Sequence, residues 1–386
     1  MHTVRVNRKG ANRVASGHPW IFSSDVLDRG QATKGEAVVV VDASGAALGT
    51  AHYSDSSQIS LRMLSERVEA IDRTFFLRRI AAAEAHRKRV VADSDAYRLV
   101  HGEGDQLPGL VIDRYGDYFT LQTLDQSMDR AKAEIVSCLE ELFAPKGMAE
   151  RNDVAVRKRE ALPLQSGVLA GEVPQTVAVR MNGLTLHADL LHGQKTGIFL
   201  DQRENYIAAA RYGRGRALDC FTSTGGFALH LAAHCESVEA VDSSEAALGV
   251  ARMNCDANGI ANVELREADV FELLAGYASA RRRFDMVVLD PPAFAKSRQN
   301  LEAATGGYRE INRRALELLG SGGILVTCSC SHHLTEAALL EIVAITSLDT
   351  GRKLRVLERR MQAQDHPVLV TVPETLYLKC LILQVI

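Results

Sequence analysis

Residues 326–333 read VTCSCSHH, so two cysteines stand one residue apart and two histidines follow directly. Such side chains could supply a catalytic nucleophile, a metal site, a disulfide or packing. Zinc needs about four convergent ligands, and four candidates within six consecutive residues do not let the chain wrap around an ion. A C-x-C pair is also a poor fit to disulfide geometry. We therefore expect no metal here and keep nucleophile and packing as the main interpretations.

Strand periodicity separates the two cysteines. Side chains two residues apart on a strand share a face, so Cys328 and Cys330 point the same way. Cys328 lies further inside the strand, and we interpret it as a buried packing residue. Cys330 lies at the carboxyl end, where its thiolate could add to C6 of a cytosine and make C5 nucleophilic towards a methyl group on a sulfonium. His332 and His333 could tune the thiol, contact phosphate or be solvated loop residues, and the sequence leaves these alternatives open.

A second reactive group follows the apolar run FDMVVL. Residues 290–294 read DPPAF. Two consecutive prolines stiffen the backbone as it leaves a sheet, so Asp290, Pro291 and Pro292 could present a carboxylate and carbonyls to a planar, amine-bearing base. The alternative is a simple strand terminator, and we favour the functional interpretation. Asp290 would bond ring N3 or the exocyclic amine and stabilise the charge that develops when a thiolate adds.

Acids and glycines at the ends of earlier strands predict a nucleoside cofactor. One strand ends in Asp219, Gly225 and Gly226 begin the following helix, and the next strand ends in Asp242. The turn lacks the glycine patterns that bind dinucleotides or nucleoside triphosphates. S-adenosylmethionine (SAM) carries an ammonium, a sulfonium and a ribose but no phosphate, which suits carboxylates at such a turn. Asp269, after the third strand, could accept from the adenine amine or cap a helix.

These residues need a sheet that brings strand ends together. From about residue 215, strands alternate with helices: the strands read RALDCF, SVEAVDSS, VELREADV, FDMVVLDPP and GGILVTCSCS, and the helices GGFALHLAAH and EAALGVARMNCDANG. This alternation predicts βαβ units in a doubly wound, mainly parallel α/β sheet. Ligands bind such sheets outside the carboxyl ends of the strands, where the residues named above lie.

The chain before this sheet reads as two smaller domains. Residues 1–70 contain short β-like runs broken by turns and predict a small β-barrel. Residues 71–90 have the spacing of an amphipathic helix and mark the first boundary. Residues 71–185 combine this helix with β-like runs on either side of Tyr115 and predict a central α+β domain. The third domain then spans residues 186–386.

Composition indicates a multidomain globular protein of the cytoplasm. The chain of 386 residues exceeds the ~250 to 300 at which one core usually divides. Hydrophobic residues make up 46% and charged residues 24%, which argues against disordered and membrane classes. No apolar run reaches ~18 residues, and the first residues lack the apolar core of a signal peptide. The seven cysteines should therefore be thiols.

The net charge of −3 gives no general argument for nucleic-acid binding. Two local runs are basic, however. Residues 1–24 include Arg5, Arg8, Lys9 and Arg13 and no acid, and Arg157, Lys158 and Arg159 are consecutive. These runs are either solvated faces or candidate phosphate contacts, with Arg5, Lys9, Arg157 and Lys158 as the preferred contacts.

Eight stretches resemble the bacterial 23S rRNA cytosine-C5 methyltransferases, a class I SAM-dependent family: SGHPWIFS, YRLVHGEGDQLPGLVIDRYGD, RNDVAVRKRE, HGQKTGIFLDQREN, LDCFTSTGGFA, FDMVVLDPPAF, TCSCS and DHPVLVTVPETLYLK. They run in order along nearly the whole chain. The resemblance implies an N-terminal PUA-like RNA-binding domain over residues 1–70, a central α+β domain over 71–185 and a Rossmann-like methyltransferase domain over 186–386. It also implies SAM as cofactor and 23S rRNA as partner, naked or in a large-subunit precursor, with no membrane and with a homodimer as one option.

The resemblance assigns roles residue by residue. It implies Cys330 as nucleophile and Asp290 as the acid beside the base. It implies a cofactor pocket of Asp219, Phe221, Gly225, Gly226, Asp242 and Asp269, which Phe199, Gln202 and Arg203 approach. Substrate contacts would be Pro291, Pro292 and Phe294, with Arg5, Lys9, Arg157 and Lys158 on RNA phosphates. Better-known RNA cytosine-C5 methyltransferases have a second cysteine where this chain reads DPPAF, so the base that removes the C5 proton is open, and Cys328 is no obvious substitute.

Two other functions stay open at this point. An Asp-Pro-Pro turn also suits methylation of an exocyclic or ring nitrogen in RNA, which needs no thiol adduct. A non-catalytic ribosome-assembly factor could retain the same fold. A small-molecule methyltransferase explains the preceding ~185 residues less well than a large substrate does.

Overall fold

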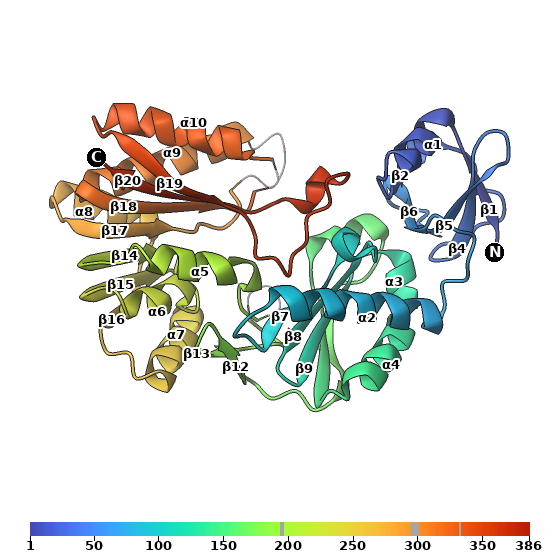
Figure 1. The fold of residues 1–386 in the computed structure, drawn as a ribbon, viewed down its shortest axis with the longest axis horizontal. Coiled ribbons are helices and arrows are strands. Elements are labelled where there is room, and N and C mark those ends of the chain that lie inside the picture. Colours follow the sequence, from blue (N-terminus) through green and yellow to red (C-terminus); the bar gives the residue numbers. More distant parts are fainter. Residues whose placement is uncertain (194–196, 295–300, 332) are drawn as a thin grey trace. The chain divides into compact units, whose positions relative to one another are not determined.

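The computed structural model describes residues 1–193, 197–294, 301–331 and 333–386 (Figure 1). The chain forms two compact units. Unit 1 contains Met1–Arg180, Ala188–Ile198 and Gln364–Thr375, and unit 2 contains Met181–His187, Phe199–Ala363 and Leu376–Ile386. No helix within the described ranges combines the length and apolar character needed to cross a membrane.

The first part of unit 1 is a six-stranded sheet in the order β2-β6-β5-β4-β1-β3. Alternating apolar residues face a core of its own that includes Val4, Ile21, Val38 and Leu61. The elements are β1 (Thr3–Val6), α1 (Arg8–Ala15), β2 (Trp20–Phe22), β3 (Val26–Asp28), β4 (Ala37–Val41), β5 (Ala47–Tyr53) and β6 (Ile59–Ser65). Asn7 caps α1 by accepting from the Gly10 amide at 2.8 Å.

The second part of unit 1 is a five-stranded sheet in the order β11-β10-β9-β8-β7, with a separate core. Its elements are α2 (Arg73–Val90), β7 (Ala96–His101), β8 (Leu110–Tyr115), β9 (Tyr118–Thr123), α3 (Gln126–Arg130), α4 (Lys132–Phe143), β10 (Gly147–Asn152) and β11 (Gln165–Gly171). The helix and paired strands predicted for this region are confirmed. After β9, Ala131 separates the helices α3 and α4. A hairpin of β12 (Val177–Met181) and β13 (Leu184–Ala188) follows.

Unit 2 is built on a seven-stranded sheet in the order β16-β15-β14-β17-β18-β20-β19. The strands are β14 (Arg216–Cys220), β15 (Ser237–Asp242), β16 (Val263–Glu267), β17 (Phe284–Leu289), β18 (Leu319–Ser329), β19 (Leu354–Arg360) and β20 (Lys379–Val385). The first five strands in that order are parallel, and β20 and β19 join as antiparallel strands. The predicted doubly wound, mainly parallel sheet is therefore confirmed.

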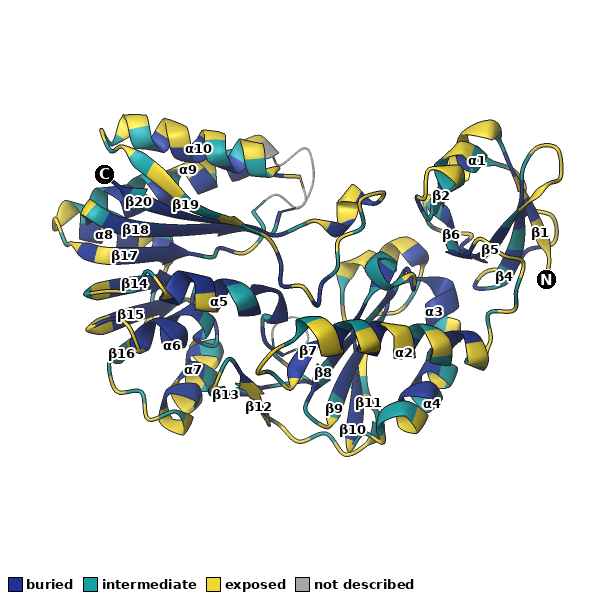
Figure 2. Cartoon of the chain, viewed as in Figure 1, coloured by how far each residue is buried: buried dark blue, intermediate teal, exposed yellow. Residues whose placement is uncertain are grey.

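Helices cover both faces of this sheet (Figure 1). They are α5 (Arg203–Ala210), α6 (Gly226–Ala232), α7 (Glu245–Ala257), α8 (Val270–Ser279), α9 (Leu301–Leu318) and α10 (Glu336–Asp349). The face under α8, α9 and α10 holds a core that includes Leu274, Tyr308, Leu325 and Leu339. Figure 2 shows β17, β18 and β20 as largely buried, as expected for strands covered on both sides.

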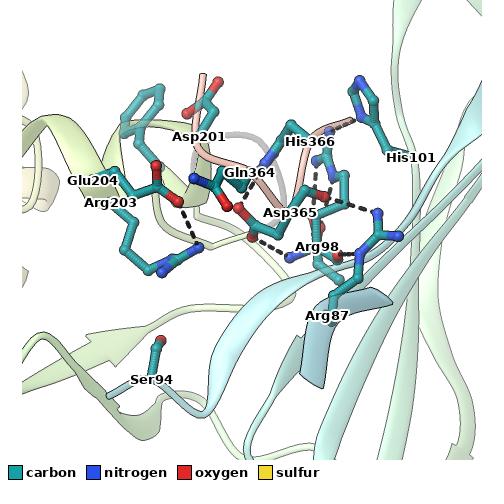
Figure 3. Close-up of polar contacts among 12 residues, drawn as sticks. Arg87, Ser94, Arg98, His101, Asp201, Arg203, Glu204, Gln364, Asp365 and His366 are labelled. Carbon is teal, nitrogen blue, oxygen red and sulfur yellow. Dashed lines mark hydrogen bonds and ion pairs between the residues drawn. The ribbon is translucent and has the colours of Figure 1, made fainter. Parts of the chain in front are cut away.

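The connection between β19 and β20 contributes Gln364–Thr375 to unit 1. Its anchor is Asp365: the Arg98 amide donates to Asp365 Oδ2 at 2.9 Å, and Arg87 Nη2 donates to the Asp365 carbonyl at 2.8 Å (Figure 3). The rings of His101 and His366 lie 5.2 Å apart beside it. The third domain expected over 186–386 thus differs from the observed unit 2, because this segment and Ala188–Ile198 pack with unit 1.

Arg157 belongs to the interior of the central domain. Its side chain is 0% exposed and donates to Asp129 Oδ1 at 2.9 Å and to the Pro163 carbonyl at 2.9 Å. It also donates to the backbone oxygen of Thr123. The prediction that Arg157 contacts RNA phosphates is therefore wrong, because its guanidinium is buried and donates to acceptors inside the protein.

We expect Arg157→Met to lower the stability of unit 1 by about 3 kcal/mol, because it removes a buried cation from Asp129 and a donor from two backbone carbonyls. Trp20, the single tryptophan, lies in unit 1, so its fluorescence during urea unfolding measures the change. Lys158→Met is the matched control: Lys158 is exposed, and its loss should change stability by less than about 0.5 kcal/mol. Equal midpoints for the two variants would contradict the structural role of Arg157.

Candidate active site

The predicted reactive residues lie at one edge of the unit 2 sheet. Cys220 pairs with Leu289 across β14 and β17, and Leu289 pairs with Thr327 across β17 and β18. Asp290 follows Leu289 directly, and Cys330 lies three residues after Thr327. Because these strands are parallel neighbours, their carboxyl ends meet. The prediction that the Cys330 strand adjoins the Asp290 strand is confirmed.

The turn after β14 is held in an unusual backbone conformation. Phe221, Ser223 and Gly225 have φ values of 63°, 51° and 89°. For the two residues with side chains, this left-handed region costs on the order of 1 to 3 kcal/mol each, so the surroundings must enforce it. Asp219 Oδ2 accepts from the Thr222 hydroxyl at 2.6 Å, and Asp242 Oδ2 accepts from the Ser223 amide at 2.8 Å. The two acids therefore hold the turn.

Two buried polar atoms at this turn have no hydrogen-bond partner within the described part of the chain: Asp219 Oδ1 and Ser223 Oγ. A buried acceptor without a partner costs roughly 1 to 3 kcal/mol, which a bound ligand can recover. An ammonium or a hydroxyl on the ligand would satisfy them, whereas a phosphate would be repelled by the carboxylate. The donor and acceptor pattern thus fits SAM.

The glycine pair serves packing within the protein. A Cβ at Gly226 would lie 2.4 Å from Cζ of Tyr206, and a Cβ at Gly225 would lie 2.4 Å from Leu229 Cδ1. Tyr206 comes from α5 and meets Phe227 edge to face, with ring centroids 4.8 Å apart. The family resemblance implied both glycines as part of the cofactor pocket. At Gly226 the structure instead places the Tyr206 ring in the space of a Cβ.

Asp290 is held by a chain of amide side chains. Gln202 Nε2 donates to Asp290 Oδ1 at 3.0 Å, and Gln202 Oε1 accepts from Asn205 Nδ2 at 2.6 Å. Arg360 Nε in turn donates to Asn205 Oδ1 at 2.9 Å. Gln202 is 2% exposed, so it orients the Asp290 carboxylate from the protein interior. Sequence reasoning placed Gln202 at the cofactor and missed this contact.

Other predicted ligand contacts also have structural partners. Asp269 caps α8 by accepting from the Glu272 amide at 3.0 Å, which confirms the capping interpretation. The Phe294 ring packs 4.8 Å from the Tyr308 ring. Pro291 is buried and Pro292 is exposed. Phe199 is half-buried, and its carbonyl accepts from the Tyr206 hydroxyl at 3.4 Å. Arg203 is buried, and its Nη2 lies 3.5 Å from Glu204 Oε1.

The two cysteines divide as predicted in burial. Cys328 is 0% exposed and faces Cys380 across β18 and β20. Burial, followed by the hydrogen bond to Cys380, raises the pKa of the Cys328 thiol well above its ordinary value. Cys330 is half-buried just past the end of β18. His333 is exposed, whereas His332 lies outside the described residues, so its predicted alternatives have no structural account.

Two side chains that the sequence did not single out bond the residues next to Cys330 in the chain. The Tyr308 hydroxyl accepts from Ser329 Oγ at 2.9 Å and lies 3.2 Å from Ser331 Oγ, so it clamps the residues on both sides of Cys330. Lys379 Nζ donates to the Ser331 carbonyl at 2.6 Å. Lys379 ends the stretch DHPVLVTVPETLYLK, which is the signal that could have drawn attention to it.

The predicted phosphate contacts other than Arg157 are exposed. Arg5 lies on β1, Lys9 on α1 and Lys158 in the basic run after β10. Lys9 Nζ lies 3.6 Å from Asp25 Oδ1, but its side chain remains 68% exposed and can still meet a phosphate. All three lie in unit 1.

The pKa of Asp219 is shifted towards neutral pH. Burial, reinforced by the negative charges of Asp290 and Asp242, raises its pKa from 3.8 to about 7 against the hydrogen bonds from Thr222 and Ala228. Its carboxylate is therefore costly to ionise without a cationic partner. Such a shift is typical of functional sites.

Comparisons with known proteins match both units. Residues 4–66 match the PUA-like domain family, and residues 98–382 match a family described as S-adenosylmethionine-dependent methyltransferase. The protein named Ribosomal RNA large subunit methyltransferase I from Klebsiella pneumoniae subsp. pneumoniae is 43% identical over 371 residues, covering 94% of this chain and 93% of that protein. The protein of the same name from Escherichia coli O139:H28 is 40% identical, covering 94% of each.

Solved structures support the fold. A protein described as a SAM-dependent methyltransferase from Streptococcus mutans is 22% identical with a TM-score of 0.84, covering 100% of both chains. Another, described as a methyltransferase complexed with SAH, is 22% identical with a TM-score of 0.86 and covers 100% of both chains. The predicted arrangement of a PUA-like domain before a SAM-methyltransferase fold is thereby confirmed.

Asp219→Asn keeps the shape of the side chain and removes its charge. We expect affinity for S-adenosylhomocysteine at pH 8 to fall about a hundredfold, since a hydrogen bond to a charged group contributes roughly 1.5 to 3 kcal/mol. Wild-type affinity should also weaken as the pH drops below about 7, because the carboxyl must lose its proton to meet an ammonium. Calorimetric titration at pH 6 and pH 8 measures both effects.

Stability without cofactor should respond with the opposite sign. The folded state raises the pKa of Asp219, so the folded chain binds its proton more tightly, and this stabilisation is lost as the pH rises from about 4 towards about 7. Asp219→Asn should therefore raise the melting temperature more at pH 8 than at pH 5. A variant that binds S-adenosylhomocysteine as tightly as wild type would contradict the assignment.

Proposed function

This chain belongs to the SAM-dependent ribosomal RNA large subunit methyltransferase I family, and we propose that it methylates C5 of a cytosine in 23S rRNA through an adduct between Cys330 and C6 of the base. The supporting observation is the pairing of β17 with β18, which places Asp290 and Cys330 at neighbouring strand ends. Cys328, the other thiol of the pair, is fully buried and faces Cys380.

The chemistry needs a nucleophile because C5 of cytosine is not reactive enough by itself. The Cys330 thiolate forms a bond to C6, and the electrons of the C5–C6 double bond make C5 nucleophilic. SAM, when bound, supplies an electrophilic methyl group. Loss of the C5 proton then restores the C5–C6 double bond, and the C6–S bond breaks to release the thiolate.

Asp290 has the role of stabilising the base during addition. Its carboxylate, held by Gln202 at 3.0 Å, bonds the exocyclic amine or a protonated N3 while charge develops on the ring. A rigid hold matters because a preorganised group does not need to reorient during the reaction. Gln202 therefore acts as a positioning residue for Asp290 rather than as a cofactor contact.

We assign the cofactor to the turn after β14. Asp219 and Ser223 offer the buried polar atoms, Asp242 supports the turn from β15, and Phe221 borders the core beside it. Gly225 and Gly226 contribute conformation and packing, while Phe199, Arg203 and Asp269 stay candidates at the rim. Pro291, Pro292 and Phe294 are assigned to the base-binding side.

Recognition of RNA is assigned to unit 1. The PUA-like match over residues 4–66 and the exposed Arg5, Lys9 and Lys158 support a surface that follows phosphates. Methylation assays on naked 23S rRNA and on large-subunit particles identify the substrate form, and light scattering decides between monomer and homodimer. A ribosomal substrate also places the proposed activity in the cytoplasm.

Cys330→Ser should lower turnover by roughly a thousandfold or more, because a hydroxyl cannot replace the thiolate as nucleophile. Cys328→Ala is the matched control two residues away, and its activity should stay within a few-fold of wild type. Nucleoside mass spectrometry of methylated rRNA should identify 5-methylcytidine, and RNA containing 5-fluorocytidine should form an SDS-stable adduct with wild type only. An N-methylated product, or full turnover by Cys330→Ser, would overturn the proposal.

Lys158→Gln should weaken RNA binding at every sequence and reduce the slope of log affinity against log salt by about 1, as expected for one lost phosphate contact. Lys353→Gln is the control, since it removes the same charge from an exposed position just before β19. Fluorescence anisotropy at several salt concentrations measures both slopes. Equal slopes for Lys158→Gln and wild type would remove Lys158 from the contact surface.

A further inference from the structure

We propose that Lys379 is the cationic partner of the Cys330 thiolate and becomes the base that takes the C5 proton once the adduct has formed. This inference rests on the proposed adduct chemistry and fills its one open step. No cysteine accompanies Asp290 in the stretch DPPAF, so the group that removes the C5 proton has to come from elsewhere.

The position of Lys379 follows from strand pairing. Lys379 begins β20 and lies opposite Ser329 on β18, one residue before Cys330. Its ammonium donates to the Ser331 carbonyl at 2.6 Å and to the Tyr377 carbonyl at 2.8 Å. Ser331 is the residue after Cys330. Lys379 therefore pairs with the residue before the nucleophile and bonds the carbonyl of the residue after it.

The ammonium is buried without an anionic side chain of its own. Lys379 is 5% exposed, and no carboxylate among the described residues lies within ion-pairing distance. Two of its three N–H groups bond the carbonyls named above, which leaves one free to donate. A buried cation in this state is expensive unless an anion approaches it.

The charge on Cys330 supplies that anion. Burial lowers the pKa of Lys379 from 10.5 to about 8, and the negative charge of Cys330 acts in the opposite direction. The interaction is reciprocal, so a charged Lys379 favours the thiolate over the thiol. Other titratable groups on the described surrounding elements include Cys328, Cys380, Tyr308, Asp290, Tyr377, Asp201 and Arg360.

Adduct formation changes this balance. When the thiolate bonds C6 it becomes a neutral thioether, so Lys379 loses its anion while burial remains. Its proton then passes to solvent, and the neutral amine is available to accept the proton from C5. The C5–H electrons restore the C5–C6 double bond, the C6–S bond breaks, and thiolate and ammonium form again as a pair. One proton is released to solvent per methyl group transferred.

Alkylation of Cys330 by iodoacetamide tests the first role without RNA. In a Cys328→Ala background, peptide mass spectrometry follows Cys330 alone in this part of the chain. Lys379→Met should shift the alkylation profile to higher pH and slow the reaction at pH 7 about tenfold, because one pKa unit is a tenfold change in thiolate. Lys379→Arg should restore the wild-type profile. An unchanged profile in Lys379→Met would overturn the pairing.

The second role separates the two substitutions. Arginine keeps the charge but does not release a proton, so Lys379→Arg should form the adduct with ordinary cytosine RNA and accumulate it as an SDS-stable complex with slow product formation. Normal turnover by Lys379→Arg would overturn the base role. Binding of S-adenosylhomocysteine by both variants establishes that they are folded, and Lys379→Gln replaces Lys379→Met if that variant is not.

The two proposals fail in different ways. If wild type forms no adduct with 5-fluorocytidine RNA, the proposed function fails whatever the alkylation profile shows. If wild type forms the adduct and the alkylation profile is insensitive to Lys379, the inference fails while the proposed function stands.

Discussion

The in-register pairing of β17 with β18, and of β18 with β20, is the constraint on which the candidate site depends. Leu289 faces Thr327 in the first pair, and Ser329 faces Lys379 in the second. Asp290, Cys330 and Lys379 therefore reach the same edge of the sheet from three different stretches of sequence. A shift of one residue in the β18–β20 pair would move the Lys379 ammonium away from the Ser331 carbonyl, and a shift in the β17–β18 pair would separate Cys330 from Asp290.

The turn after β14 depends on the same edge. Its left-handed residues Phe221 and Ser223 are stable only because Asp219 and Asp242 accept from the turn on either side. The Tyr206 ring of α5 packs against Gly226 at the start of α6, so the two helices are in contact there. Since Gln202 immediately precedes α5 and bonds Asp290, the turn after β14 and the Asp290 carboxylate share one support.

Local patterns predicted the elements and the strand-end acids because each of these depends on neighbours in sequence. Contacts between distant segments could not be predicted in this way: Gln202 and Asp290 are 88 residues apart, and Lys379 and Ser331 are 48 apart. The predicted phosphate contact of Arg157 was wrong for a related reason. Three consecutive basic residues read as one exposed face, but a 3-10 helix turns Arg157 inward to Asp129 while Lys158 stays exposed.

Asp219 and Lys379 have opposite charges, and burial disfavours the ionised form of both. Burial raises the pKa of Asp219 to about 7 and lowers the pKa of Lys379 to about 8, so each group is ionised at a cost near neutral pH. Under the two proposals, a cation on the bound cofactor removes that cost for Asp219, and the Cys330 thiolate removes it for Lys379 until the thiolate bonds the base. The partner of Asp219 arrives with the cofactor, whereas the partner of Lys379 is lost when the adduct forms, so the proposed site changes its charge balance at cofactor binding and again at proton transfer.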